Sequence, residues 1–93
     1  MAYSVTNNEQ NQRFEIIADG ETAHLDYRQH NGNLALMHTL VPDSISGRGI
    51  ASALAKHALE YAKTAEQKVM VYCPFVAQYL KRHPVYNDLV DKK

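Results

Sequence analysis

The fold is decided by residues 38–63, which read HTLVPDSISGRGIASALAKHALEYAK. The first part of this stretch is apolar and ends at Pro42, which cannot donate a hydrogen bond to a sheet and therefore ends a strand. A loop with two glycines follows. Beyond the loop, apolar residues recur at helical spacing, which predicts an amphipathic helix. These residues are Ala51, Leu54, Ala55, Ala58, Leu59 and Ala62.

The loop reads Ser46-Gly47-Arg48-Gly49-Ile50-Ala51-Ser52. Two glycines one residue apart let the backbone turn tightly and approach a ligand without a Cβ in the way. The first amides of a helix have no intrahelical partners and carry the positive end of the helix dipole, so such a turn suits a diphosphate. The alternative interpretation is a loop that only gives the helix a flexible start.

Two common phosphate-binding motifs do not fit this loop. A Walker loop needs a lysine after its glycines, and Ile50-Ala51-Ser52 supplies none. A dinucleotide fingerprint needs a third Gly or Ala where Ser52 stands. It also belongs in an early strand–helix–strand unit, whereas here several strands come first.

Three antiparallel strands are expected before the loop, at residues 14–18, 22–30 and 34–41. Asp19-Gly20 and Asn31-Gly32 connect them, and both dipeptides are typical of tight hairpin turns. The third strand is the most continuously apolar, which indicates a central position. Residues 1–12 are rich in Asn and Gln, so we interpret them as a frayed arm with at most a short strand at residues 4–6.

After the helix, residues 69–72 have the pattern of a short buried strand. A second helix is expected to begin near Pro74 and to end at His83-Pro84, and residues 85–90 to form an edge strand or a short turn. A crossover helix between two strands predicts that they pair in parallel with a right-handed connection. The predicted fold is α+β: an antiparallel three-stranded meander followed by a helix, a parallel strand and a helix, in one domain over residues 13–93.

Composition narrows the classes of function. Ten basic and ten acidic residues cancel, which argues against a general nucleic-acid binder. One cysteine rules out an internal disulfide and favours a reducing, cytoplasmic setting. We expect no membrane span and no secretory signal, because the apolar stretches are short and no charged region precedes one at the start. A core this small is compatible with a monomer or a homodimer.

The order of strand, Val41-Pro42, glycine loop and helix resembles the GNAT acetyltransferase superfamily. Its diphosphate loop has the pattern Arg/Gln-x-x-Gly-x-Gly/Ala; Gly49 and Ala51 match, and Ser46 replaces the usual Arg or Gln. The chain looks especially like a subgroup of very short GNAT-like proteins. That resemblance extends to Tyr72-Cys73-Pro74 and Tyr79.

The resemblance implies that acetyl-coenzyme A lies in a wedge where the strand before the loop separates from its parallel neighbour. Leu40 and Val41 would offer backbone groups to the pantetheine chain. The diphosphate would be held by Ser46, Gly47, Arg48, Gly49, Ile50, Ala51 and Ser52. The implied activity is N-acyl transfer to an amine of unknown identity. The chain lacks room for the two helices that usually wall the acceptor site.

Three residues are candidates for the chemistry. Cys73 lies where a parallel strand meets a helix, so it would carry the acyl group transiently or shape the thioester pocket; the alternative is a small buried residue. By resemblance, Tyr79 would reprotonate the coenzyme A thiolate and His38 would deprotonate the amine, and core packing is the alternative for both. No histidine or cysteine spacing indicates a metal site.

Three functions therefore compete. The first is an acetyl-coenzyme A dependent N-acyltransferase, working by direct transfer or through a cysteine-acyl intermediate. The second is a non-catalytic module that binds acyl-coenzyme A. The third is a small interaction domain in which the glycine loop is purely structural.

Overall fold

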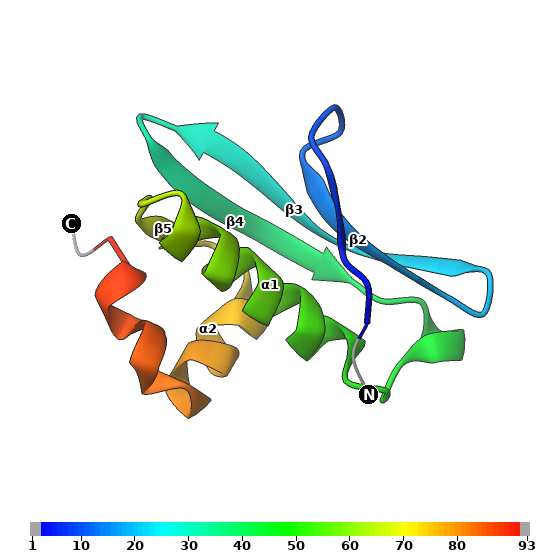
Figure 1. The fold of residues 1–93 in the computed structure, drawn as a ribbon. Helices are drawn as coiled ribbons and strands as arrows, with labels where there is room; N and C mark the ends of the chain where they lie inside the picture. Colours follow the sequence, from blue (N-terminus) through cyan, green and yellow to red (C-terminus); the bar gives the residue numbers. More distant parts are fainter. Residues whose placement is uncertain (1–2, 92–93) are drawn as a thin grey trace.

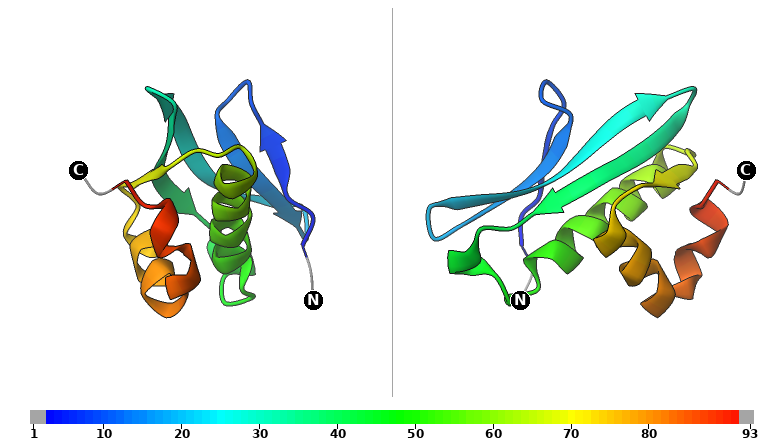
Figure 2. Two further views of the ribbon diagram at one scale, coloured as in Figure 1. Left: turned by 60° about the vertical axis from the view of Figure 1, so that its left-hand side comes forward. Right: turned by 180° about the vertical axis from the view of Figure 1, so that it is seen from behind.

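A computed structural model describes residues 3–91 as a five-stranded mixed sheet with its helices on one face (Figure 1, Figure 2). The strands lie in sequence order, so each pairs with the next along the chain. They are β1 (Thr6–Asn8), β2 (Arg13–Ala18), β3 (Glu21–His30), β4 (Asn33–Leu40) and β5 (Val69–Val71). The helices are α1 (Ile50–Thr64) and α2 (Pro74–Arg82), and the short 3-10 helices are η1 (Asp43–Ile45) and η2 (Pro84–Leu89).

The antiparallel part of the sheet is built on the two expected hairpin turns. Asp19 and Gly20 join β2 to β3 with φ of 51° and 77°, and Asn31 and Gly32 join β3 to β4 with φ of 52° and 83°. Positive φ at both central residues is the requirement of a type I′ turn, which matches the twist of the strands it connects. The turn dipeptides therefore set the register of the meander.

β4 and β5 pair in parallel across the crossover helix α1, as expected. The pairing is short: it runs from Leu34 opposite Val69 to Leu36 opposite Val71, and closes with the Tyr72 N–H donating to the Leu36 carbonyl at 2.9 Å. β4 continues to Leu40, but within residues 3–91 no strand pairs with its last four residues on that side. The two strands thus separate and leave an open backbone edge (residues 37–40).

A β-bulge in β4 changes which side chains face the helices. Tyr27 pairs with Leu36 and Asp26 pairs with His38, so Met37 is an extra residue on β4. Leu36 is buried in the core, whereas His38 lies beside Asp26 on the face of the sheet that the helices leave uncovered. The bulge therefore turns His38 outward at the point where β4 leaves β5.

The core lies between the sheet and α1. Phe14, Leu25 and Leu36 contribute from the strands and are fully buried. On α1, five of the six predicted apolar positions are buried, and Ile50 joins them: Ile50, Leu54, Ala55, Ala58, Leu59 and Ala62. Ala51 is the exception, because it faces a cavity beside the glycine loop.

The two ends of the chain differ from the sequence prediction. β1 pairs antiparallel with β2 inside the segment interpreted as a frayed arm, so the antiparallel part has four strands rather than three. Tyr3 and Val5 pack against the core, and the Tyr27 hydroxyl donates a hydrogen bond to Asn7 Oδ1. The local spacing of apolar residues does not reveal these contacts between side chains. At the other end η2 replaces the expected edge strand or turn, and only an isolated bridge joins Val90 to β5. The α+β class itself is confirmed.

Candidate functional site

The glycine loop ends at an α1 N-terminus that is not capped. Gly47 and Gly49 have φ of 78° and 76°, the left-handed region that favours glycine. Gly49 is the N-cap and offers no side chain to the helix. In the first backbone hydrogen bond at this end of the helix, the Ala53 N–H donates to the Gly49 carbonyl at 3.0 Å. Across the described chain, no backbone N–H of residues 47–52 donates to another protein group, so this row of donors is free for a ligand.

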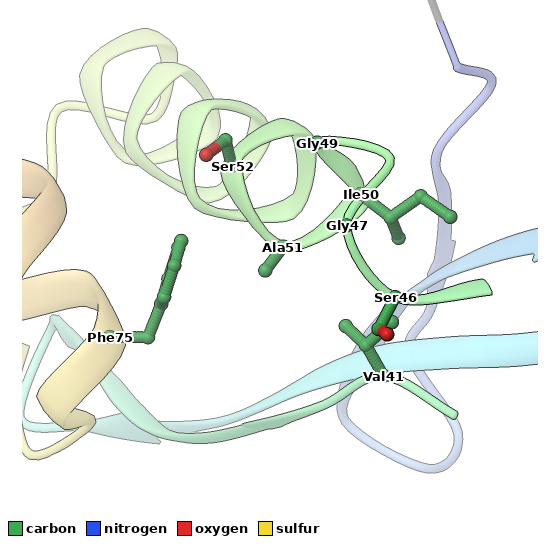
Figure 3. Close-up of a pocket in the computed structure, with 8 residues that line it drawn as sticks. All are labelled: Val41, Ser46, Gly47, Gly49, Ile50, Ala51, Ser52 and Phe75. Carbon is green, nitrogen blue, oxygen red and sulfur yellow. The ribbon is translucent and has the colours of Figure 1, made fainter. Parts of the chain in front are cut away.

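A cavity of about 320 Å³ lies directly against these donors (Figure 3). Figure 3 shows Phe75 projecting from α2 toward the first turn of α1, with Val41 at the sheet side of the space. The lining residues are Val41, Ser46, Gly47, Gly49, Ile50, Ala51, Ser52 and Phe75. Seven of them belong to the binding set expected from the sequence. Phe75 was not anticipated, because only the packing of α2 beside α1 brings it there.

The chemistry of this cavity fits a diphosphate. None of its lining residues carries a carboxylate, so no acidic side chain in its wall repels an anion. A Cβ built on Gly47 or Gly49 would meet no protein atom within 4 Å, which means that both glycines border open space rather than packed side chains. The open edge of β4 (residues 37–40) ends next to Val41, which lines the cavity.

Two expected binding residues lie outside the cavity wall. The Arg48 guanidinium donates to Asp19 Oδ2 at 2.6 Å, and the Arg48 carbonyl accepts from the Tyr3 hydroxyl at 2.9 Å. The Arg48 side chain is therefore held at the β2–β3 turn. The backbone N–H of Arg48, in contrast, donates to no group in residues 3–91. Leu40 is half exposed at the end of β4, opposite His24.

Cys73 lies on the helix side of the sheet, at the N-cap of α2. Its Sγ is 3.2 Å from Thr39 Oγ1, on the open edge of β4. Only 2% of the residue is exposed. Reactive cysteines are partly exposed, whereas buried ones are usually inert, so this environment is the one expected of a packing residue.

His38 lies on the uncovered face of the sheet beside an acidic partner. Its Nε2 is 3.4 Å from Asp26 Oδ2, and His24 Nδ1 is 2.9 Å from Asp26 Oδ1. The His38 side chain is 60% exposed, while those of Asp26 and His24 are 17% and 15% exposed. The Asp26 carboxylate thus lies within ion-pair distance of a solvent-accessible imidazole, an arrangement that a general base can use.

Comparison with known proteins identifies this architecture. A family model described as GCN5-related N-acetyl-transferase matches residues 13–89. The chain belongs to this acetyltransferase family. Protein NATD1 of Gallus gallus is 42% identical over 50 residues, which are 54% of this chain and 46% of the NATD1 chain. NATD1 of Danio rerio is 35% identical over 57 residues, 59% of this chain and 52% of its own. The matched regions thus cover about half the length of these relatives.

A solved structure supports the same assignment over nearly the full length. The NMR structure of a GCN5-like protein from Staphylococcus aureus aligns with 98% of this chain and 90% of its own, at a TM-score of 0.74 and 26% identity. The short acetyltransferase fold expected from the sequence is therefore confirmed.

The third catalytic candidate, Tyr79, lies on α2. It is 8% exposed, its ring stacks on His83 at 4.1 Å, and it lines a groove between α1 and α2. Burial, with a smaller contribution from the charge of Glu60, raises the pKa of Tyr79. Cys73, Tyr79 and His38 thus occupy three separate places: the inner face of the sheet, the helix layer and the outer face.

The sequence interpretation missed Asp26 and His24. They alternate with buried residues on β3 and so looked like ordinary solvent-facing positions. Only the pairing of β3 with the bulged β4 brings them to His38. In residues 3–91 no group of three or more His, Cys, Asp or Glu side chains is placed to hold a metal ion. Nor does this part of the chain include a helix with the length and apolar character needed to cross a membrane.

Proposed function

We propose that this protein binds acetyl-coenzyme A and transfers its acyl group to an amine. The observation that carries the proposal is the row of free backbone N–H groups at residues 47–52, facing a cavity beside the open edge of β4. The N–H groups would hold the diphosphate. The open edge would pair with the amides of the pantetheine chain, and Leu40 and Val41 at its end would guide the thioester toward the sheet.

The position of His38 suggests from which side the acceptor amine arrives. The helices and the core fill the inner face of the sheet, so an amine can approach most easily across the uncovered outer face. There, His38 would accept the proton that the amine loses as its nitrogen forms a bond to the acyl carbon and the carbon–sulfur bond breaks. Asp26 would stabilise the protonated imidazole. The coenzyme A thiolate would leave and be reprotonated either by Tyr79, which lines the groove adjoining the cavity, or by water.

Thermal melting in the presence of coenzyme A tests the binding site. A ligand at a hundred times its dissociation constant adds about 2.7 kcal/mol to the free energy of unfolding, so the melting temperature should rise clearly. AMP at the same concentration is the control, because it lacks both the diphosphate and the pantetheine. An unchanged melting temperature with coenzyme A would overturn the proposal and leave the purely structural loop.

Turnover separates the transferase from a non-catalytic module. Release of free coenzyme A thiol would be measured with acetyl-coenzyme A and a panel of primary amines, from spermidine to a lysine-containing peptide. Acceptor-dependent release is the expected result. Tight coenzyme A binding with no release across the panel would favour the binding module.

A mass measurement tests the route through Cys73. Because this thiol is buried and directed at Thr39, we expect transfer to proceed directly to the amine. The intact mass of the protein should therefore stay unchanged after incubation with acetyl-coenzyme A and no acceptor, and Cys73→Ala should retain most of the activity. A stable gain of one acetyl group that Cys73→Ala abolishes would instead establish the cysteine-acyl intermediate.

A further inference from the structure

The glycine loop is fixed in the core at its two ends but not in its middle. Ile45 and Ile50 are fully buried, whereas residues 46–49 between them are exposed. Gly47 and Gly49 lie in this exposed part, and a Cβ on either would meet no protein atom within 4 Å. Because glycine has the widest choice of backbone conformations, packing alone does not hold this part of the loop in one shape.

Arg48, between the two glycines, is held by two segments that are far away in the sequence. The Asp19 carboxylate of the β2–β3 turn accepts a hydrogen bond from the Arg48 guanidinium, and the Tyr3 hydroxyl donates one to the Arg48 carbonyl. Both partners are themselves fixed, since Asp19 stands in a tight hairpin turn and Tyr3 packs against the core. The segment before β1 passes beside the start of α1 (Figure 1, Figure 2). The middle of the loop is therefore tied to the sheet by side chains from outside the loop.

The bond from Tyr3 also sets the direction of one of the free backbone donors. The Arg48 carbonyl and the Gly49 N–H belong to the same peptide group, which is planar and trans, so the two point in opposite directions. If this peptide turned over, the φ of Gly49 would change, and glycine accepts both positive and negative φ at little cost. The Tyr3 hydroxyl at 2.9 Å from the Arg48 carbonyl opposes that rotation. The Gly49 N–H is thus directed away from Tyr3, and Gly49 lines the loop cavity.

We infer that Tyr3 and Asp19 are positioning residues for coenzyme A: they hold the Arg48–Gly49 peptide in the one orientation that offers the Gly49 N–H to the diphosphate. This inference rests on the proposed function. It also assigns the Arg48 side chain the role of an anchor for the loop instead of a ligand of the diphosphate. Because the contacts exist before the donor binds, the loop does not have to be ordered by the ligand, and the affinity rises accordingly.

NMR relaxation of the protein without ligand tests the orientation of the peptide. In the wild-type protein, the ¹⁵N relaxation dispersion of the Gly49 amide should be flat. Tyr3→Phe removes only the hydroxyl, so the peptide should begin to exchange between two orientations and the dispersion should appear. Tyr27→Phe is the control, because the Tyr27 hydroxyl bonds Asn7 instead of the loop. An order parameter and a dispersion at Gly49 that do not change in Tyr3→Phe would overturn the inference.

Calorimetry with coenzyme A tests the effect of Tyr3 on binding. Tyr3→Phe should weaken coenzyme A binding about fivefold, the size of one neutral hydrogen bond. At saturating acetyl-coenzyme A, kcat should stay the same and only the KM for the donor should rise, because the reacting groups are untouched. Tyr27→Phe should bind coenzyme A as the wild-type protein does.

The sign of the effect at Asp19 decides what the Arg48 side chain does. Asp19→Gly keeps a dipeptide that suits the tight turn but removes the carboxylate, and it should weaken coenzyme A binding about threefold, as expected for an exposed ion pair. Arg48→Ala should cause a similar loss, and the double variant should lose no more than either single one. Glu21→Gln removes a negative charge next to the same turn; since Glu21 forms no ion pair within residues 3–91, this variant should bind normally.

The outcomes separate this inference from the proposed function. If the wild-type protein binds coenzyme A and the Tyr3 and Asp19 variants bind it equally well, only the positioning role is overturned. Tighter binding by Asp19→Gly, or losses that add in the double variant, would make the released Arg48 guanidinium a diphosphate ligand and overturn it as well. If the wild-type protein binds no coenzyme A, the proposed function fails and the positioning role falls with it.

Discussion

Replacing Gly49 with Asp is expected to abolish detectable coenzyme A binding while the protein stays folded. The new carboxylate would lie at the N-cap of α1, against the free N–H groups and in the position proposed for the diphosphate. Like charges in direct contact across an interface cost several kcal/mol, which corresponds to a loss of about a hundredfold or more. Calorimetric titration of coenzyme A measures this loss.

The same chain offers a matched control for the backbone effect. Gly32 has a φ of 83°, close to the 76° of Gly49, and a Cβ at either position would meet no protein atom within 4 Å. Gly32→Asp should therefore have a similar effect on stability, about 1–2 kcal/mol at most for left-handed backbone. Asp tolerates this conformation, as Asp19 shows at a φ of 51°. Unchanged coenzyme A affinity in Gly49→Asp would remove the loop from the binding site.

Replacing His38 with Gln is expected to lower kcat/KM for acyl transfer by about a hundredfold, the usual contribution of a positioned general base. The amide of Gln can still accept a hydrogen bond but does not take up a proton at neutral pH. Because His38 lies on the outer face of the sheet, away from the loop cavity, the dissociation constant of coenzyme A should stay the same. Steady-state kinetics and calorimetry on the same preparation separate the two quantities.

His30→Gln is the control for this second experiment. His30 is also an exposed histidine of β3 or β4, but it lies at the far end of β3, beside the Asn31-Gly32 turn. This variant should leave both kcat/KM and coenzyme A affinity unchanged. If His38→Gln retains full activity, the deprotonation does not depend on this imidazole, and the role assigned to Asp26 is lost as well.

Local sequence signals were sufficient to predict the antiparallel meander and the crossover helix. Asp19-Gly20 and Asn31-Gly32 adopt the positive φ values that tight hairpins need, and a glycine is the residue with the least cost there. The spacing of apolar residues predicted the start of α1 to within one residue: the predicted pattern begins at Ala51, and the helix begins at Ile50. Such signals depend on residues a few positions apart, so they can be detected in a single sequence.

The loop site was also within reach of the sequence. Free N–H groups at a helix start follow from helix geometry once two glycines and no capping side chain are found. The surroundings of the site could not be predicted from the sequence. Phe75 reaches the cavity because α2 packs beside α1, and the groove that Tyr79 lines exists only between those two helices.

The sequence by itself determined the order of the elements, the hairpin turns and the exposed backbone donors of the glycine loop, because each depends on residues that are close along the chain. Only the tertiary structure decided which side chains meet. A single extra residue, Met37, turned His38 out of the core and onto Asp26, and it left Thr39 facing the buried Cys73. A one-residue shift in a strand moves side chains to the other face, and that shift shows only when the partner strand is in place.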